Sequence, residues 1–158
     1  TEVLITEEQL LLPSSNDNLT ITFPDTQEYT FTFDASNLDA PTLSVYKSEM
    51  FGDTSVYIRG DMNGWGEVDT VTYQGNASYS VEVELAAASY GFKVASADWS
   101  TFNLGAGTDG GVVNLDQSLT LSAGSNDNLS FSADEAATYI FTVTGPNPNA
   151  PTVTVTKK

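Results

Sequence analysis

Short runs of alternating apolar and polar residues follow one another along most of the 158-residue chain. Runs of this kind, separated by Asn, Asp, Ser and Pro, predict β-strands that bury one face. Residues 6–12 have a cap-like start and allow one helical turn, but no window has sustained helical periodicity. The pattern therefore predicts an all-β fold, with strands at 20–23, 29–33, 42–46, 55–59, 79–85, 90–95, 139–143 and 152–156.

The turn sequence SNDNL occurs twice, at 15–19 and at 125–129, an offset of 110 residues. At that offset residues 1–47 align with residues 111–157 without a gap, and the match includes a second shared sequence, Ala-Pro-Thr. An ungapped match that keeps its turn residues indicates an internal repeat rather than a chance similarity between two β-rich stretches.

The repeat predicts how the chain is divided. Residues 54–158 have the length of one complete immunoglobulin-like antiparallel β-sandwich. Residues 1–47 are expected to be the second half of a preceding repeat, joined to it by residues 48–53. The chain starts at Thr1 with no initiator methionine or leader pattern, so we interpret it as part of a longer protein.

A half-sandwich on its own would expose strand edges and one apolar face. We therefore expect residues 1–47 to pack against the following module or against a second chain. Because this segment resembles residues 111–157, a strand-swapped dimer is one way to cover it.

Charge and composition exclude several classes of function. The chain has 21 acidic and 5 basic residues, a net charge of −16, and no basic patch for nucleic acid or an anionic membrane. It has no cysteine and no histidine, which excludes Ser-His-Asp and Cys-His nucleophilic sites and histidine-bound zinc. The Asp/Asn turns lack the full spacing of a calcium loop. We expect no metal, no cofactor, no catalysis and no membrane span.

Two segments carry residues that strand packing does not explain, VYIRGDMNGWG (56–66) and YGFKVASADWSTFNLG (90–105). Trp65 lies in a turn rich in Gly, Asn and Asp, and Trp99 follows a short Ala-Asp turn. Lys93 falls on the strand face opposite the aromatic residues beside it, because side chains alternate along a strand. The only two tryptophans of the chain are thus expected on neighbouring turns.

Carbohydrate binding uses residues of these types. The apolar face of a pyranose ring packs on an indole, while hydroxyls need charged or amide partners. Lys93 would donate to hydroxyls, with Asn103 and Asp98 as further polar contacts. Alternative roles are a core position for Trp99, a solvated lysine at 93 and a turn-forming Asn103.

Together, Gly60 to Trp65 (G-x-x-N-x-W), the pair Phe92-Lys93 and Trp99 resemble the immunoglobulin-like starch-binding modules attached to bacterial pullulanases and amylases. More distantly they resemble carbohydrate-binding module family 48 and the glycogen-binding domain of AMP-activated kinase. The resemblance covers about residues 54–157 and implies that Trp65, Lys93 and Trp99 hold α-glucan. Asn103 corresponds only loosely to a polar contact of the family.

The sequence thus predicts a non-catalytic, extracellular bacterial module that binds starch, maltooligosaccharide, pullulan or glycogen. It would target an attached amylolytic enzyme or a surface protein to that glucan. Residues 1–47 lack both tryptophans and the site lysine, so one site is expected. The alternative is a structural or adhesive immunoglobulin-like repeat of a surface protein with no sugar site.

Overall fold

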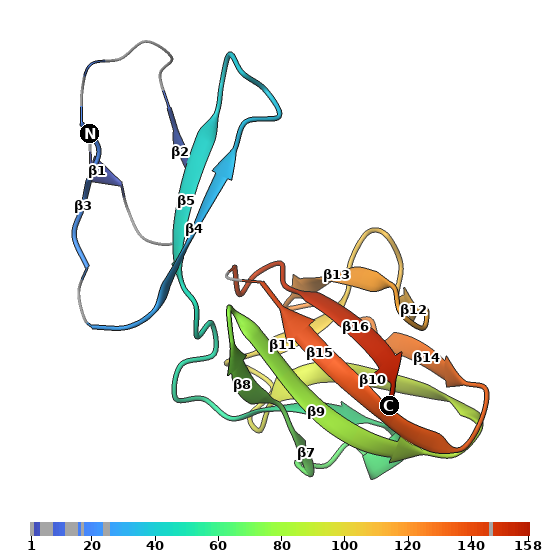
Figure 1. The fold of residues 1–158 in the computed structure, drawn as a ribbon. Coiled ribbons are helices and arrows are strands. Elements are labelled where there is room, and N and C mark those ends of the chain that lie inside the picture. The colour runs from blue at the N-terminus through green and yellow to red at the C-terminus, as the bar shows by residue number, and fades with distance from the viewer. Residues whose placement is uncertain (1, 4–7, 12–15, 17, 24–25, 146) are drawn as a thin grey trace.

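A computed structural model describes residues 2–3, 8–11, 16, 18–23, 26–145 and 147–158. The amino-terminal segment forms two small sheets that stand apart from the rest of the molecule (Figure 1). One contains a parallel pair and the other an antiparallel trio in the order β2-β5-β4. These strands are β1 (Glu2–Val3), β2 (Glu8–Leu10), β3 (Thr20–Ile21), β4 (Tyr29–Asp34) and β5 (Thr42–Lys47).

The remaining chain forms an antiparallel β-sandwich with one 3-10 turn, which confirms the predicted fold class. Its elements are β6 (Val56–Gly60), η1 (Asp61–Asn63), β7 (Asp69–Thr70), β8 (Thr72–Gly75), β9 (Ser78–Leu85), β10 (Ala88–Ser96), β11 (Asn103–Ala106), β12 (Val112–Val113), β13 (Ser118–Ala123), β14 (Leu129–Ala133), β15 (Ala137–Thr144) and β16 (Thr152–Lys157).

Two layers of strands enclose the core. In one layer β10 is central, with β6 on one edge and β14 and β11 sharing the other. In the second layer β15 lies between β9 and β16. β13 joins the layers, because Ser118 to Thr120 pair with β16 and Leu121 to Ala123 pair with β11. The sandwich therefore closes along one side, through a strand that passes from one sheet to the other.

The core contains inward-facing aromatic residues from both layers. Phe92 of β10 is fully buried, and its ring centroid lies 5.3 Å from that of Phe141 on β15. Phe131 of β14 packs edge-on against Phe141 at 6.1 Å. The exposed Ser130 and Ser132 alternate with buried residues along β14, as expected for a strand with one solvated face.

Each predicted strand overlaps an observed one. This holds for 20–23, 29–33 and 42–46 in the first segment and for 55–59, 79–85, 90–95, 139–143 and 152–156 in the sandwich. The helical turn allowed at 6–12 is wrong for the residues at its centre. Glu8–Leu10 is a strand, because its backbone pairs with β5. Residues 6, 7 and 12 lie outside the described part of the chain. Sequence reasoning also missed β8, β11, β13 and β14 and the two-residue strands β1, β7 and β12. β11 and β13 contain few β-branched or aromatic residues to signal a strand, whereas β14 (LSFSA) has a clear alternation that was overlooked.

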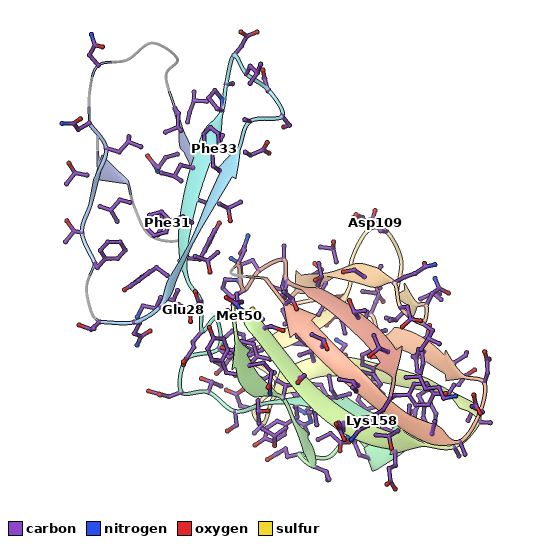
Figure 2. All side chains as sticks on the ribbon, viewed as in Figure 1. Glu28, Phe31, Phe33, Met50, Asp109 and Lys158 are labelled. Atoms are coloured by element: carbon purple, nitrogen blue, oxygen red, sulfur yellow. The ribbon has the colours of Figure 1, made fainter. Side chains whose placement is uncertain are left out.

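The junction at 48–53 is anchored on the sandwich. Phe51 is buried, its ring centroid lies 4.6 Å from that of Tyr79, and its backbone N–H donates to the Tyr79 hydroxyl. Tyr73 donates to the Glu28 carboxylate across the junction at 3.1 Å. Beyond this contact the first segment projects away from the sandwich, with Phe31 and Phe33 far from it (Figure 2).

Candidate functional site

The first tryptophan turn follows directly from β6. Gly60 ends this strand where no side chain fits, because a Cβ there would lie 2.4 Å from the Gly91 carbonyl oxygen. The Asn63 side chain then holds the turn: its Oδ1 accepts from the Gly60 N–H at 3.0 Å, and its Nδ2 donates to the Ile58 carbonyl at 2.7 Å. The close approach of Gly91 explains the Gly of the G-x-x-N-x-W sequence, and the two bonds of Asn63 explain its Asn.

Trp65 is held at the end of this turn in the left-handed backbone region, with φ of 64°. Its N–H donates to the Gly60 carbonyl at 2.8 Å, and its indole Nε1 donates to Asp61 Oδ1 at 3.2 Å. The other oxygen of Asp61 accepts from the Gly91 N–H at 2.6 Å. A bulky residue with positive φ is a local cost that surrounding bonds must offset.

The second tryptophan turn connects β10 to β11 and is organised by Asp98. Its carboxylate accepts from the Ser96 hydroxyl and from both the N–H and the hydroxyl of Ser100 and of Thr101. The hydrogen bonds from Ser96, from Thr101 and from the Ser100 hydroxyl hold the pKa of Asp98 well below its ordinary value. Trp99 follows with φ of 60°, so both tryptophans occupy the left-handed region.

The two indoles lie next to each other. Their ring centroids are 6.2 Å apart and their planes make an angle of 40°. Both side chains are half-buried, so part of each ring remains accessible. The result is a tilted aromatic surface built from two turns that are 34 positions apart in the sequence (99 − 65).

Arg59 connects the two turns. This residue is only 7% exposed. Its Nε donates to the Trp65 carbonyl, and its Nη1 donates to the carbonyls of Ser96 and Ala97, each at 2.9 Å. Its guanidinium also stacks on the Trp99 ring, with Cζ 3.9 Å from the ring centroid. One side chain therefore binds the backbone of both turns and lies against one of the indoles.

Lys93 lies directly opposite Arg59 in the pairing of β10 with β6. Like charges in this position repel, but the two cations have separate acceptors. Lys93 is 6% exposed, and its ammonium donates to Asn103 Oδ1 at 3.0 Å and to the Ser125 carbonyl. Burial lowers the pKa of Lys93, and the charge of Asp127 partly offsets that shift.

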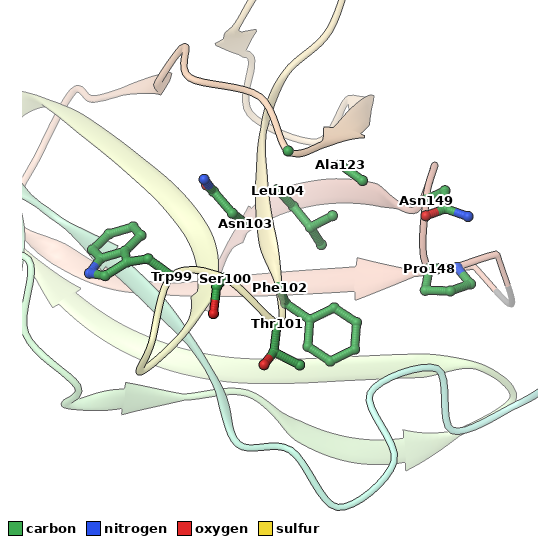
Figure 3. A pocket seen from close by; sticks show the side chains of 10 residues that line it. Trp99, Ser100, Thr101, Phe102, Asn103, Leu104, Ala123, Pro148 and Asn149 are labelled. Carbon is green, nitrogen blue, oxygen red and sulfur yellow. The ribbon is translucent and has the colours of Figure 1, made fainter.

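A hollow of about 310 Å³ opens beside the second turn (Figure 3). Asn103, Phe102 and Asn149 are among its lining residues, and Trp99 stands at one end of it. The hollow thus extends the accessible surface from the indoles toward the β11 edge of the sandwich, with amide and hydroxyl groups along its wall.

Among the predicted site residues, the structure brings Trp65 and Trp99 into ring contact and joins Lys93 to Asn103. Asp98 lies at the same turn, where bonds within the turn occupy both of its oxygens. That these residues bind a ligand stays a prediction.

Sequence reasoning missed Arg59. The available signal was an arginine within the otherwise mostly apolar strand sequence VYIRG, one residue before the glycine that opens the turn. Which carbonyls it would reach depends on the Ser96 turn, which is 37 positions away. That distance in sequence explains why spacing alone did not identify it.

In the described part of the chain, no group of three or more acidic residues could hold a metal ion. The same residues include no helix long and apolar enough to cross a membrane.

No protein-family model matches the chain, and no curated protein matches it. Among solved structures, the chain is similar to one described as the ligand-induced structure of AmyP-SBD, a starch-binding domain. The sequence identity is 20% and the TM-score is 0.46, over 65% of this chain and 72% of that chain.

Proposed function

We propose that the sandwich is a non-catalytic module that binds α-glucan on the surface formed by Trp65 and Trp99. The observation that carries the proposal is the pair of indoles 6.2 Å apart and tilted by 40°. Indole faces pack on the apolar faces of sugar rings, and a tilted pair suits the curvature of an α-1,4-linked chain better than a flat one. A spacing comparable to the size of one pyranose ring lets each indole contact a different sugar.

The surroundings of the indoles support a neutral, hydroxylated ligand. Arg59 lies against one face of Trp99, which leaves ligand contact to the rest of that ring. Lys93 bonds to Asn103 Oδ1, so the Asn103 amide nitrogen is directed away from it and is free to donate to a sugar hydroxyl. We therefore assign Lys93 to orienting Asn103 as well as to direct donation. The net charge of −16 disfavours anionic ligands and leaves an uncharged glucan unaffected.

The test is retention on amylose in native affinity electrophoresis, with titration calorimetry on maltoheptaose. Expected dissociation constants are on the order of 10–1,000 μM, about 4–7 kcal/mol. Trp65→Ala and Trp99→Ala should each weaken binding about tenfold or more, as expected from about 1.4 kcal/mol of lost ring contact. Phe33→Ala is the matched control, because it removes an exposed aromatic ring far from the site. Wild-type protein that migrates unretarded would refute the proposal.

We further propose that the module targets an attached amylolytic enzyme, or a bacterial surface protein, to extracellular starch. The support is the resemblance of its motif to modules with that role. The prediction specific to this chain is that it binds maltooligosaccharides without shortening them. Release of reducing ends from starch by the purified chain would overturn it.

The second candidate is a structural or adhesive repeat without a sugar site. It is favoured by the strand registers of residues 1–47, which match those of residues 111–157, because repeated structural units are typical of tandem modules. The electrophoresis experiment separates the two, because a structural repeat gives no retention in any variant.

A further inference from the structure

The backbone of the first segment repeats that of residues 111–157 pair by pair. β1 pairs with β3 in parallel at Glu2 and Thr20, and β12 pairs with β14 in parallel at Val112 and Ser130, a shift of 110 for each residue. The same shift relates every β2–β5 pair to a β13–β16 pair, and every β4–β5 pair to a β15–β16 pair. The segment therefore has the strand pairing of the second half of the sandwich.

In the sandwich, residues 54–110 cover that second half in two ways. β9 pairs with the edge of β15 that does not face β16, along the whole strand from Ala137 to Thr144. Phe92 of β10 lies over the inner face of β15, against Phe141. One first-half segment thus supplies both an edge strand and an aromatic side chain.

The corresponding face of the first segment is covered only in part. Val45, which pairs with Phe31, is fully buried, whereas other apolar positions are open to solvent. Among the described strands, β4 pairs with β5 alone. Phe31 is 53% exposed, whereas its counterpart Phe141 is 0% exposed. Leu19 is 44% exposed against 0% for Leu129. Phe31 is thus exposed at the position where Phe141 contacts Phe92 of β10 and pairs with β9.

The exposed face also has a shape that suits an inserted ring. Phe23, Tyr29 and Phe31 line an open hollow of about 400 Å³. In the sandwich the equivalent of Phe23 is the small Ala133, and Phe92 lies against the equivalent of Phe31. The first segment therefore has an aromatic-lined hollow next to a strand, β4, whose only partner among the described strands is β5. A first half would occupy both places.

We propose that the edge and face of β4 bind a β-segment with the sequence pattern of residues 54–110, and so complete a second sandwich. Strand addition to the edge would supply main-chain bonds, and an aromatic side chain equivalent to Phe92 would fill the hollow. Exchange of identical segments between copies cannot satisfy this face. Each chain has two second halves and one first half, so a swap leaves one second half uncovered per chain.

The test is an extended chain in which a second copy of residues 54–110 precedes Thr1. Gly110 joins Thr1 directly, because residue 111 corresponds to residue 1 in the repeat. Amide hydrogen exchange of 29–34 and 42–47 should slow at least 100-fold relative to the original chain. The result does not depend on sugar binding, because the readout is backbone protection.

Two comparisons keep the experiment decisive. Phe31→Asp in the extended chain should abolish the new protection and leave that of 137–144 unchanged, which shows that the original sandwich is still folded. If 29–34 stays unprotected while 137–144 is protected, the proposal is overturned. It is also overturned if the original chain is a dimer in which 29–34 is already protected and which Phe31→Asp converts to monomer. In that case the face is covered by a second copy.

Discussion

The described strands of residues 1–47 have the same registers as those of residues 111–157, but several of their apolar residues are far more exposed. In the carboxyl-terminal copy the residues of β15 that point inward are fully buried, whereas Phe31 and Phe33 at the corresponding positions of β4 are exposed. The pairing of strands within a half is thus local, and it forms with or without a cover. Burial, and most of the stability that comes with it, depends on the other half.

The largest effect should come from truncating the same phenylalanine in each copy. Phe141→Ala removes a ring packed against two others in a closed core, and we expect a loss of about 3–5 kcal/mol of unfolding free energy. Phe31→Ala should cost less than about 1 kcal/mol, because its ring is already largely in water. Denaturant unfolding followed by fluorescence measures both variants. Equal losses would show that the first segment is covered in solution.

Arg59 distinguishes the sandwich from the first segment, because residues 1–47 contain no arginine. Arg59→Ala leaves three carbonyls at the two turns without their donor, and should cost about 2–4 kcal/mol and abolish amylose retention. Arg59→Lys keeps the charge but not the planar guanidinium with its several donors. Relative to Arg59→Ala, it should recover more stability than binding. Exchange rates in 42–47 serve as an internal control and should not change. Binding that survives Arg59→Ala intact would contradict its positioning role.

Trp65 allows strain and function to be separated. Since its φ is 64°, glycine suits this position better than alanine, and Trp65→Gly should be more stable than Trp65→Ala by about 1 kcal/mol. Both variants lose the indole, so both should lose binding to the same extent. Thermal unfolding and maltoheptaose titration of the pair measure this. A glycine variant less stable than the alanine variant would show that the turn is not held in this conformation.

The smallest effect is the acid dependence of the second turn. The folded-state pKa of Asp98 lies below its ordinary value of 3.8 because hydrogen bonds from Ser96, from Thr101 and from the Ser100 hydroxyl favour the charged form. Its contribution to stability is fully present above that ordinary value and is lost as pH falls through the lower, folded-state pKa. Asp98→Asn should lower the melting temperature at neutral pH, and the difference from wild type should shrink below pH 3.8. A difference that stays constant with pH would contradict this account.

Much of the fold could be predicted because the alternation of apolar and polar neighbours indicates a strand without reference to distant parts of the chain. The alternation at 29–33 and 139–143 gave strands in the predicted places. β11 was missed because its sequence NLGA contains no β-branched or aromatic residue, and its pairing with β13 is set by the closure of the sandwich. β13 (SLTLSA) and β14 (LSFSA) do alternate, and sequence reasoning overlooked that signal.

The candidate site likewise has some features that the sequence predicts and others that depend on tertiary contacts. Alternation, turn residues and self-similarity were enough to predict that two tryptophans lie on turns, that Lys93 faces away from the core aromatics, and that residues 1–47 repeat 111–157. They could not predict that Arg59 joins both turns or that Lys93 is buried against Asn103 and Ser125. Nor could they predict that the indoles meet at an angle of 40°. Most of these contacts join residues 10 to 38 positions apart, which the order of strands in the sheets brings together.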